Sequence, residues 1–564
     1  MSNVGDMINS YTKSLDEYLK IEPGVTYIIP FSQRNYEWRK QDVHRLFNDL
    51  ISLYNTDSND MHMLNFFTFS KTNEGNLKIF DGQQRTVTCL LLLAVIAQKL
   101  YKGGKTKAAD QIRKSYFETH DELRTDNIQK KIKFDSVEDD EFFYKITAQD
   151  FDISSIKNIL KGSDLNKNQR NMATNIGYLN ELLNTFVQEN LISDLGALSV
   201  AVTDKTFLVE FIANTEDIAL SMFESLNNTG KNIEKYYVLK NDMVKCLGEN
   251  AVKEVWQSID FNLSELNTNA FLIAVGTIFA GKTTTSKELD NLYSNTDKEN
   301  PQDMQKLLVL LKNASNKFLK ICNPNQMEDS NKFELRRYKN ISDKIHMFGM
   351  RQHRPIILAM LMKNDSLAEI NEILNEVLKL TIKNFYFGEE KANTIEKKFA
   401  DFAREIYSGI ISVEALKERI IKLSINDSKL KVAVENKNIT QNNKIAYILR
   451  EVYNNEFKDN ELEVSVQNND LEHILPKTPK KEWLSWFNDE DERKKLTNSI
   501  GNMTLWLYTD NRAAKNAQFD VKKKVYAESG LPENKRISKM KKWTSKEIQD
   551  RSEQLADKIV KTFR

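Results

Sequence analysis

Cysteine is scarce in this chain, and its placement excludes several classes of protein. The three cysteines, Cys89, Cys246 and Cys322, are scattered over 564 residues, and no C-x-x-C pair occurs. A disulfide framework and a cysteine-ligated zinc knuckle are therefore not expected. A reduced, cytoplasmic setting fits this use of cysteine.

Long apolar runs are also lacking. The longest covers residues 89–97, which is far below the ~18 residues that would suggest a membrane span. Residues 1–6 show no basic patch followed by an apolar stretch, so no secretion signal is expected. The sequence thus predicts no membrane partner.

Proline and glycine are few, with eight and eighteen residues, and this predicts many helices and few tight turns. The net charge is only +1, so the overall balance does not point to a nucleic acid and local charge must be examined. Residues 521–564 hold 13 Lys and Arg against 6 Asp and Glu. Such a tail suits a DNA-facing surface or a solvated amphipathic helix, and both interpretations stay open.

The N-terminal part combines short strands with a buried helix. Residues 27–29 predict a strand stopped by Pro30, and residues 78–80 predict a second strand. The second strand leads into the turn pair Asp81-Gly82, after which residues 86–100 predict a buried helix. A strand, a polar turn and a helix in this order can form a phosphate site, because helix N-termini offer free N–H groups.

The remainder is predominantly helical by pattern. Residues 217–245 predict two helices separated by a turn at 227–230, and residues 246–450 continue as helices without an evident repeat. From about residue 454 the character changes, and residues 463–466 alternate like a strand.

The sharpest chemical signal lies near the C-terminus. In Glu472-His473-Ile-Leu-Pro, an acidic residue stands beside a histidine, so that one can bind a divalent metal while the other takes a proton from water. Asn502 follows 29 residues later, and Asn511 nine residues after that. A lone Glu-His pair is usually only a surface pair, but three ordered elements at this spacing favour a catalytic site.

This arrangement resembles the ββα-metal (HNH) nuclease superfamily, in which an Asp-His-Ile-x-Pro strand precedes an Asn-Leu-x-x-Leu strand and a metal-binding helix. More closely, it resembles the nuclease half of GmrSD-type, modification-dependent restriction endonucleases. The matching segments are Glu-His-Ile-Leu-Pro at 472–476, Gly-Asn-Met-Thr-Leu-Trp at 501–506, Asn-x-x-x-Lys-Asn-x-x-Phe at 511–519, and Lys523, Lys524, Tyr526, Trp543, Thr544 and Arg551.

The resemblance implies a role for each matching residue. It assigns His473 as the general base, and Glu472 and Asn511 as candidate metal ligands. Asn502 becomes the residue that orients the strand and the base, and Asn516 is a second candidate for the helix position. Glu472 departs from the superfamily pattern, which often has Asp at this position. The longer carboxylate affects the expected geometry of the metal site.

Two polar clusters stand out near the N-terminus, at residues 29–38 and 80–88. Gly82 allows a ligand to approach the backbone, and the arginines Arg34 and Arg85 can hold phosphate oxygens. Gln83 and its neighbour Gln84 can donate and accept hydrogen bonds. Taken alone, these residues make a plausible phosphate cradle.

The two clusters resemble the Ile-Pro-x-x-Gln-Arg and Asp-Gly-Gln-Gln-Arg motifs of the nucleotide-hydrolysing half of GmrSD and SspE proteins, which has a ParB/sulfiredoxin-like fold. Residues 223–230 and 239–241 also match an element of that family. The match implies nucleotide binding by Gln33, Arg34, Asp81, Gly82, Gln83, Gln84, Arg85 and Asn227. Met63-Leu64-Asn65 departs from the family's aromatic-Leu-Gly, and Asn228-Thr229 from its commoner Asp-Arg.

A competing motif lies at residues 276–283, which fit the Walker A pattern G-x-x-x-x-G-K-[ST]. A P-loop wraps phosphate with exposed backbone N–H groups, whereas the interior of this segment is apolar. Residues 269–280 instead predict one helix capped by Gly281, and this interpretation is preferred.

Together these observations predict an α+β, predominantly helical chain. A ParB/sulfiredoxin-like nucleotide-binding (NTPase) domain with a helical extension is expected at 1–245, an all-α spacer at 246–453, and a C-terminal ββα-metal (HNH) nuclease domain at 454–564. The resemblance implies an NTP-regulated, divalent-metal-dependent DNA endonuclease of anti-phage defence that senses DNA modification. The alternative is a nucleotide-switched DNA-binding regulator whose nuclease site is vestigial.

The expected cofactors are Mg²⁺ or a similar hard divalent ion and a nucleoside triphosphate, with GTP, ATP, CTP and UTP all open. The expected macromolecular partner is double-stranded DNA, including modified phage DNA. The sequence leaves open whether the protein forms a homo-oligomer. It also leaves open whether the enzyme nicks one strand or cuts both.

Overall fold

The computed structural model describes residues 8–22, 24–31, 33, 35–55, 60–120, 128–162, 165–227, 235–282, 289–294, 296–391, 393–456, 469–487, 489–507 and 516–564. The chain divides into two compact units, and the division passes through the helices α12 and α13. The described residues are mostly helical with one mixed sheet, which confirms the expected α+β, predominantly helical class. The finer division at 245 and 453 stays a prediction.

The first unit is built on a six-stranded mixed sheet of order β1-β8-β3-β4-β2-β7. Its strands are β1 (Ile8–Ser14), β2 (Tyr27–Ile29), β3 (His62–Lys71), β4 (Leu77–Asp81), β7 (Ile132–Phe134) and β8 (Thr206–Ala213), and a separate pair is formed by β5 (Glu118–His120) and β6 (Ile128–Lys130). The two strands predicted at 27–29 and 78–80 are confirmed as β2 and β4.

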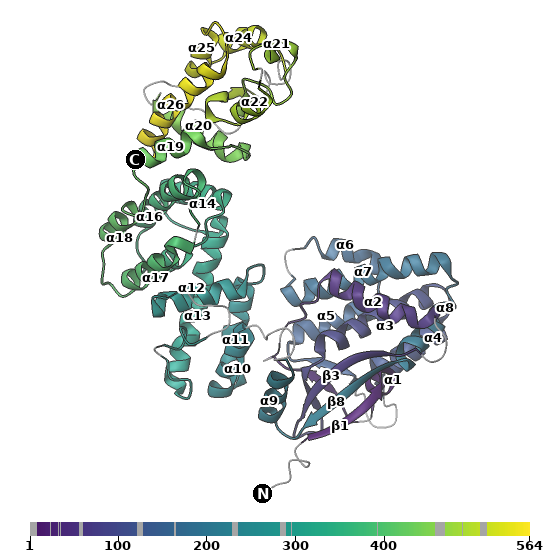
Figure 1. Cartoon of the computed structure of the whole chain (residues 1–564). Helices are drawn as coiled ribbons and strands as arrows, with labels where there is room; N and C mark the ends of the chain where they lie inside the picture. Colours follow the sequence, from purple (N-terminus) through teal and green to yellow (C-terminus); the bar gives the residue numbers. More distant parts are fainter. Residues whose placement is uncertain are drawn as a thin grey trace. The chain divides into compact units, whose positions relative to one another are not determined.

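Helices cover both faces of this sheet. The helices of this unit are α1 (Leu15–Leu19), α2 (Lys40–Asn55), α3 (Gln83–Lys102), α4 (Thr106–Tyr116), α5 (Val137–Thr147), α6 (Ile156–Ile159), α7 (Lys167–Glu189), α8 (Asp194–Asp204), α9 (Glu216–Asn227), α10 (Lys235–Leu247) and α11 (Glu249–Asn262). Figure 1 shows α2, α3, α5 and α7 gathered on one side of the sheet.

The helix α3 is central to the core of this unit. Residues 86–97 are all buried, and burying each large aliphatic side chain contributes about 1.5–3 kcal/mol. On β4, Ile79 packs into this core, whereas its neighbour Phe80 packs on the other face with Phe223 of α9. This alternation along the strand explains how one short strand serves two helical layers.

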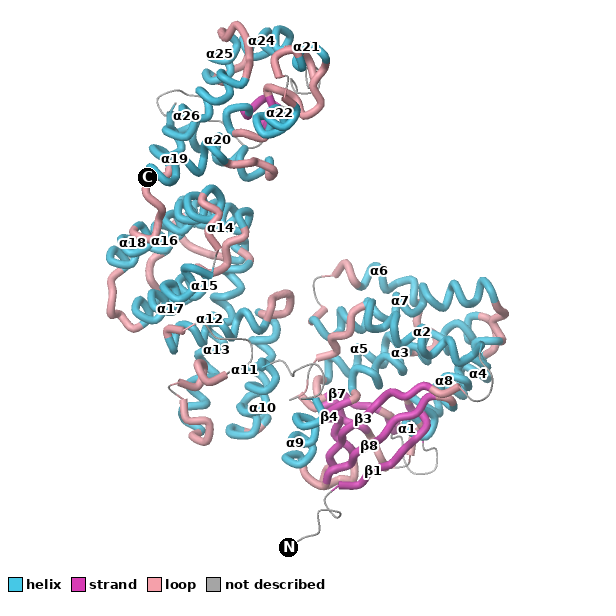
Figure 2. Tube along the Cα trace, viewed as in Figure 1, coloured by secondary structure: helices cyan, strands magenta, loops and turns pink. Residues whose placement is uncertain are grey.

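The second unit is nearly all helical (Figure 2), with one short strand pair among its described residues. Its elements, together with the two helices that cross the division, are α12 (Thr268–Ala280), α13 (Pro301–Cys322), α14 (Lys332–Phe348), α15 (Arg354–Lys363), α16 (Leu367–Leu380), the π-helical turn Thr381–Phe387, α17 (Asn393–Tyr407), α18 (Val413–Ile421), α19 (Asp427–Asn436), α20 (Asn442–Glu456), β9 (Asn469–His473), α21 (Lys481–Leu484), α22 (Glu490–Thr497), β10 (Met503–Leu507), α24 (Phe519–Glu528), α25 (Pro532–Ser538) and α26 (Ser545–Thr562).

Of the segment that matched the Walker A pattern, the described residues 276–282 are helical up to Ala280. Its residues up to Ala280 belong to α12, and Gly281 ends that helix with a φ of +63°. The N–H of Gly281 donates to the carbonyl of Thr277 at 2.9 Å. Backbone N–H groups used inside a helix cannot cradle phosphate, so the interpretation as a capped helix is confirmed and a P-loop is excluded.

Two other expectations fall partly or wholly outside the described residues. The strand predicted at 463–466 lies outside them, as does the turn between α9 and α10. Among the described residues, no helix combines the length and the apolar content that crossing a bilayer would require.

Candidate functional site

Three parallel strands bring the N-terminal motifs to one edge of the sheet. β2 runs parallel to β4, with Tyr27 opposite Leu77, and parallel to β7, with Ile29 opposite Phe134. The carboxyl ends of these strands therefore meet, and a ligand site is commonly found at such an edge. The Pro30 to Gln33 loop follows β2, and Asp81 ends β4 just before α3 begins.

At the start of α3 the backbone passes so close to a neighbouring side chain that position 82 has room only for glycine. The φ of Gly82 is +100°, and a Cβ on this residue would lie 2.2 Å from Cδ1 of Phe67. Its N–H donates to Oδ1 of Asp81 at 2.7 Å. A residue with a side chain would thus clash with Phe67 of β3 and be strained as well, so Gly82 allows the chain to pass close to β3 where α3 begins.

The side chain of Arg85 is bound by the protein itself. Its guanidinium donates to the carbonyls of Leu64 and of Phe66, the latter at 2.9 Å, and it lies 3.3 Å from Oδ1 of Asp81. These carbonyls flank Asn65, whose φ of +67° marks a bulge in β3. Asn tolerates this left-handed conformation, which explains why it can replace the glycine of the family pattern.

Gln84 joins the two N-terminal motifs. Its Oε1 accepts the N–H groups of Glu37 at 2.8 Å and Trp38 at 3.3 Å, and its Nε2 donates to the carbonyl of Asn35 at 2.9 Å. The amide therefore holds the 35–38 backbone against α3. Each such hydrogen bond contributes about 0.5–1.5 kcal/mol, so Gln84 has a strong positioning effect on this loop.

Three asparagines on α7 hold the same loop from the other side. Asn168 accepts the N–H of Tyr36 at 2.9 Å, Asn171 donates to the carbonyl of Tyr36 at 2.7 Å, and Asn175 donates to that of Trp38 at 2.7 Å. They were not among the site residues predicted from the sequence. Their spacing of three and four residues, on one face of a helix, was the signal that could have found them.

The remaining N-terminal candidates are Gln33, Gln83, Asn227 and Arg34. Gln33 and Gln83 are buried. Asn227 is the last residue of α9, but its side chain lies outside the described residues, as does Arg34 altogether. The structure therefore brings together Gln33, Asp81 and the start of α3 at one sheet edge, and the role of each in nucleotide binding stays a prediction.

The C-terminal candidates lie on an antiparallel strand pair. β9 and β10 place His473 opposite Met503 and Glu472 opposite Thr504. Successive side chains of a strand leave it on opposite faces. The side chain of Glu472 therefore shares a face with Thr504, and that of His473 lies on the other face.

Glu472 is buried and bound to Lys522 of α24. The ammonium of Lys522 pairs with the Glu472 carboxylate and donates to the backbone carbonyl of His473 at 2.9 Å. The two side chains are only 0% and 5% exposed. Burial lowers the pKa of Lys522, and the adjacent carboxylate opposes this shift. Lys522 was not among the residues predicted for this site, because it is 50 residues from its partner in the chain.

His473 is held in its neutral form. Burial lowers its pKa to about 4, and the nearby charges of Lys477 and Lys522 act in the same direction. Its Nε2 is buried and accepts or donates no hydrogen bond among the described residues. A neutral imidazole nitrogen can accept a proton or bind a metal, so the group fits both kinds of chemistry.

Asn502 fixes the turn that follows His473. Its Oδ1 accepts the N–H of Leu475 at 2.7 Å and the indole N–H of Trp543 at 3.1 Å. Its Nδ2 donates to the carbonyls of Leu475 and Thr497, both at 3.0 Å. With four hydrogen bonds and no exposure, Asn502 is placed to orient the strand that carries His473.

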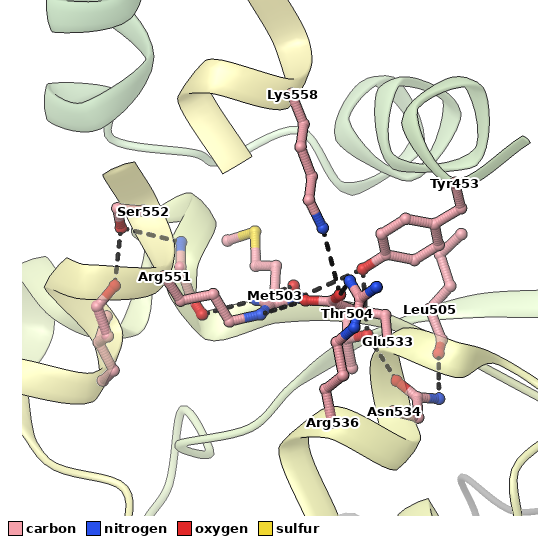
Figure 3. Close-up of polar contacts among 12 residues, drawn as sticks. Tyr453, Met503, Thr504, Leu505, Glu533, Asn534, Arg536, Arg551, Ser552 and Lys558 are labelled. Carbon is pink, nitrogen blue, oxygen red and sulfur yellow. Dashed lines mark hydrogen bonds and ion pairs between the residues drawn. The ribbon is translucent and has the colours of Figure 1, made fainter. Parts of the chain in front are cut away.

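Ion pairs and hydrogen bonds join α25 and α26 to β10 and the residues just before it (Figure 3). Arg551 of α26 donates to the carbonyls of Gly501 and Met503, each at 2.7 Å, and pairs with Glu533 at 3.0 Å. Glu533 also lies 3.2 Å from Arg536 and 3.5 Å from Lys558. Three of the cations of residues 521–564 therefore bind Glu533 rather than standing alone, and of these Arg551 is buried.

Gly501 lets α26 approach this strand pair closely. A Cβ at position 501 would lie 2.0 Å from the carbonyl oxygen of Ile548 and 2.4 Å from Oγ of Ser552. That hydroxyl accepts the N–H of Gly501 at 3.1 Å. The backbone that precedes Asn502 is therefore seated directly on α26.

The expected metal site includes one residue outside the described part of the chain. Asn511 lies outside the described residues, and Asn516 is exposed. No group of three or more His, Cys, Asp and Glu side chains suited to a metal occurs in the described part of the chain. Glu472 would have to exchange Lys522 for a cation in order to serve as a ligand. Its assignment as a metal ligand stays a prediction.

Two family models match this chain. The N-terminal domain of the GmrSD restriction endonucleases matches residues 5–244, and the C-terminal domain of the same family matches residues 424–558. The second match begins before β9 and includes α19 and α20, which pack against α26. No curated protein matches the sequence. The two matches together cover more than half of the chain, which therefore belongs to the GmrSD restriction endonucleases, enzymes whose substrate is DNA.

Proposed function

We propose that this restriction endonuclease cuts DNA with the help of a divalent metal, under the control of a nucleoside triphosphate bound to its N-terminal domain. It would act in the cytoplasm against phage DNA and respond to DNA modification. The proposal combines the nuclease motifs around His473 with the Asp-Gly-Gln-Gln-Arg motif at the edge of the N-terminal sheet.

One observation carries the nuclease part of this proposal. His473 ends β9, where burial lowers its pKa to about 4, and Lys522 and Asn502 bind the backbone at His473 and Leu475. A histidine that is neutral and fixed in place suits a general base, because it must accept a proton from water while the metal polarises the phosphate.

The test is cleavage of a supercoiled plasmid in the presence of Mg²⁺, with modified and unmodified DNA of the same sequence. We expect the wild type to cut at least one of the two and His473→Ala to lose this activity. His62→Ala, a histidine in β3, is the matched control and should cut like the wild type. Equal cleavage by His473→Ala and the wild type would contradict the assignment of the base.

The nucleotide part is tested separately by triphosphate hydrolysis. Arg85→Ala should lose hydrolysis, because it removes the guanidinium that binds the bulge of β3 and Asp81. Lys282→Ala should hydrolyse normally, because the segment before it is the helix α12. Thermal unfolding of both variants shows whether the fold is retained. Loss of hydrolysis in Lys282→Ala alone would overturn this part of the proposal.

A second candidate function is favoured by one observation. Because Lys522 already neutralises Glu472, the chain could instead be a nucleotide-switched DNA-binding regulator with a vestigial nuclease site. Nucleotide-dependent DNA binding without cleavage, under any of the metals and DNA substrates tested, would support the regulator.

A further inference from the structure

A buried lysine lies against the loop that follows β2. Lys240 of α10 is 1% exposed, and its ammonium is 3.7 Å from the centre of the Phe31 ring. The nearest carboxylate is that of Asp260, at 3.9 Å, which is beyond hydrogen-bond distance. Within the described part of the chain, no acceptor forms a hydrogen bond with this ammonium.

The nearest carboxylate also binds a second residue, through its other oxygen. The hydroxyl of Tyr236 donates to Oδ1 of Asp260 at 2.7 Å. Burial lowers the pKa of Lys240, and Asp260, Glu249 and Asp135 only partly oppose this shift. An ammonium removed from water without a hydrogen-bond acceptor is costly, and the cation–π contact with Phe31 offsets only part of this cost.

The same loop carries a second buried donor without an acceptor. Gln33 is 4% exposed, and its Nε2 has no hydrogen-bond partner among the described residues. Its backbone N–H donates to the carbonyl of Pro30 at 3.0 Å, which forms a turn between Pro30 and Gln33. Phe31 lies within this turn, so Lys240 and Gln33 flank one short segment.

This segment is tied to the edge of the sheet where the nucleotide motifs meet. The N–H of Phe31 donates to Oδ2 of Asp135 at 2.7 Å, and Asp135 follows β7. The loop therefore lies between the end of β7 and the end of β4, where Asp81 leads into α3. The two unsatisfied donors belong to the same edge as the start of that helix.

The chemistry of these groups selects the class of ligand. An ammonium has no acceptor, and the unpartnered group of Gln33 is its amide NH₂. Both therefore call for a ligand rich in acceptor oxygens and negative charge. Arg85, the cation of the Asp-Gly-Gln-Gln-Arg motif, is already bound to two backbone carbonyls and to Asp81, so the motif's own arginine is not free to fill this role.

We propose that Lys240 and Gln33 bind phosphate oxygens of the nucleoside triphosphate in the N-terminal domain. The inference rests on the proposed nucleotide binding of this domain, for which Gln33 is already a candidate. It adds Lys240 and assigns both side chains to the phosphate chain. On binding, the ammonium gains the acceptors that the protein alone does not supply, and Arg85 acts as a positioning residue for the β3 bulge.

The test is calorimetric binding of ATP, GTP, CTP and UTP, each measured separately with Mg²⁺, to the full-length protein. For the nucleotide that binds, Lys240→Met should weaken the affinity about ten- to hundred-fold, since charged hydrogen bonds are lost. Lys245→Met is the matched control on the same helix, because that lysine is 67% exposed in its side chain, and its affinity should equal that of the wild type.

Two further measurements separate ligand recognition from folding. Inorganic triphosphate should compete with the nucleotide in the wild type, as expected for recognition of the phosphate chain. Gln33→Glu, which places a negative charge in the loop, should also weaken binding, and it carries the test if Lys240→Met does not fold. A purely structural lysine would lower the unfolding temperature of Lys240→Met without changing nucleotide affinity.

The outcomes for the two proposals are distinct. If the wild type binds a nucleotide and both Lys240→Met and Gln33→Glu bind it equally well, the present inference is wrong while nucleotide binding stands. If the wild type binds none of the four nucleotides, nucleotide binding fails and the inference fails with it.

Discussion

The ammonium of Lys522 and the carboxylate of Glu472 form a solvent-excluded ion pair at the end of β9, although 50 residues separate them in the chain. Because Lys522 also donates to the backbone carbonyl of His473, this pair joins α24 to the strand that carries the candidate base.

Lys522→Met should destabilise the C-terminal unit by about 3–5 kcal/mol, because it removes the cation beside a buried carboxylate. The double variant Glu472→Leu, Lys522→Met should recover most of this loss, since neither charge is then buried. Urea unfolding measures both. Lys524→Met, at an exposed position of the same helix, should change stability by less than about 0.5 kcal/mol. A small loss in Lys522→Met would show that the ion pair contributes little.

The titration of His473 follows from its surroundings. In metal-free protein we expect its NMR-detected pKa near 4, and Lys477→Gln should raise it, because a nearby positive charge disfavours the imidazolium. The folded pKa lies below the ordinary value of 6.5, so the contribution of this group to stability is complete above about pH 6.5 and is lost as the pH falls toward 4. A pKa of 6.5 or more in the wild type would contradict the burial seen here.

Alanine substitutions at Gly82 and Gly75 distinguish the free-energy cost of steric overlap from that of backbone strain. Both glycines have positive φ values, of +100° and +87°, but only Gly82 would place a Cβ against Phe67. Gly75→Ala should cost about 1–2 kcal/mol from the left-handed conformation alone. Gly82→Ala should cost clearly more and should disturb the start of α3. Equal unfolding free energies for the two variants would show that Phe67 moves aside freely.

Gln84→Met tests the connection between the two N-terminal motifs. It keeps the length of the side chain but removes its hydrogen bonds to the backbone at 35–38, and we expect a loss of about 1–3 kcal/mol. Hydrogen exchange should increase at the amides of Glu37 and Trp38. Lys102→Ala, at the exposed end of α3, is the control and should leave exchange in this loop unchanged.

Local patterns predicted several elements correctly. The apolar pair in Tyr27–Ile29 and the long apolar run after Gly82 were sufficient to predict β2 and α3. The apolar interior of the Walker-like segment predicted α12 with its glycine cap. In each case the signal lies within one element, where side-chain periodicity and turn residues determine the structure.

The long-range contacts could not be predicted in the same way. Nothing near Lys522 indicates that it meets Glu472, and a helical lysine such as Lys240 is ordinarily exposed. Arg85 matched a phosphate-binding pattern, yet its guanidinium is bound to the protein. Such pairings depend on how distant elements pack, and a single sequence does not contain that information.

The close seating of Gly501 on α26 has a consequence for protein synthesis. The backbone leading to Asn502 emerges from the ribosome before the helix segment around Ile548 and Ser552 that receives it. While the chain is being made, β10 therefore lacks its support, and we expect the surroundings of His473 to assemble only after α26 has been translated. The incomplete chain would therefore not cleave the DNA of the cell that produces it.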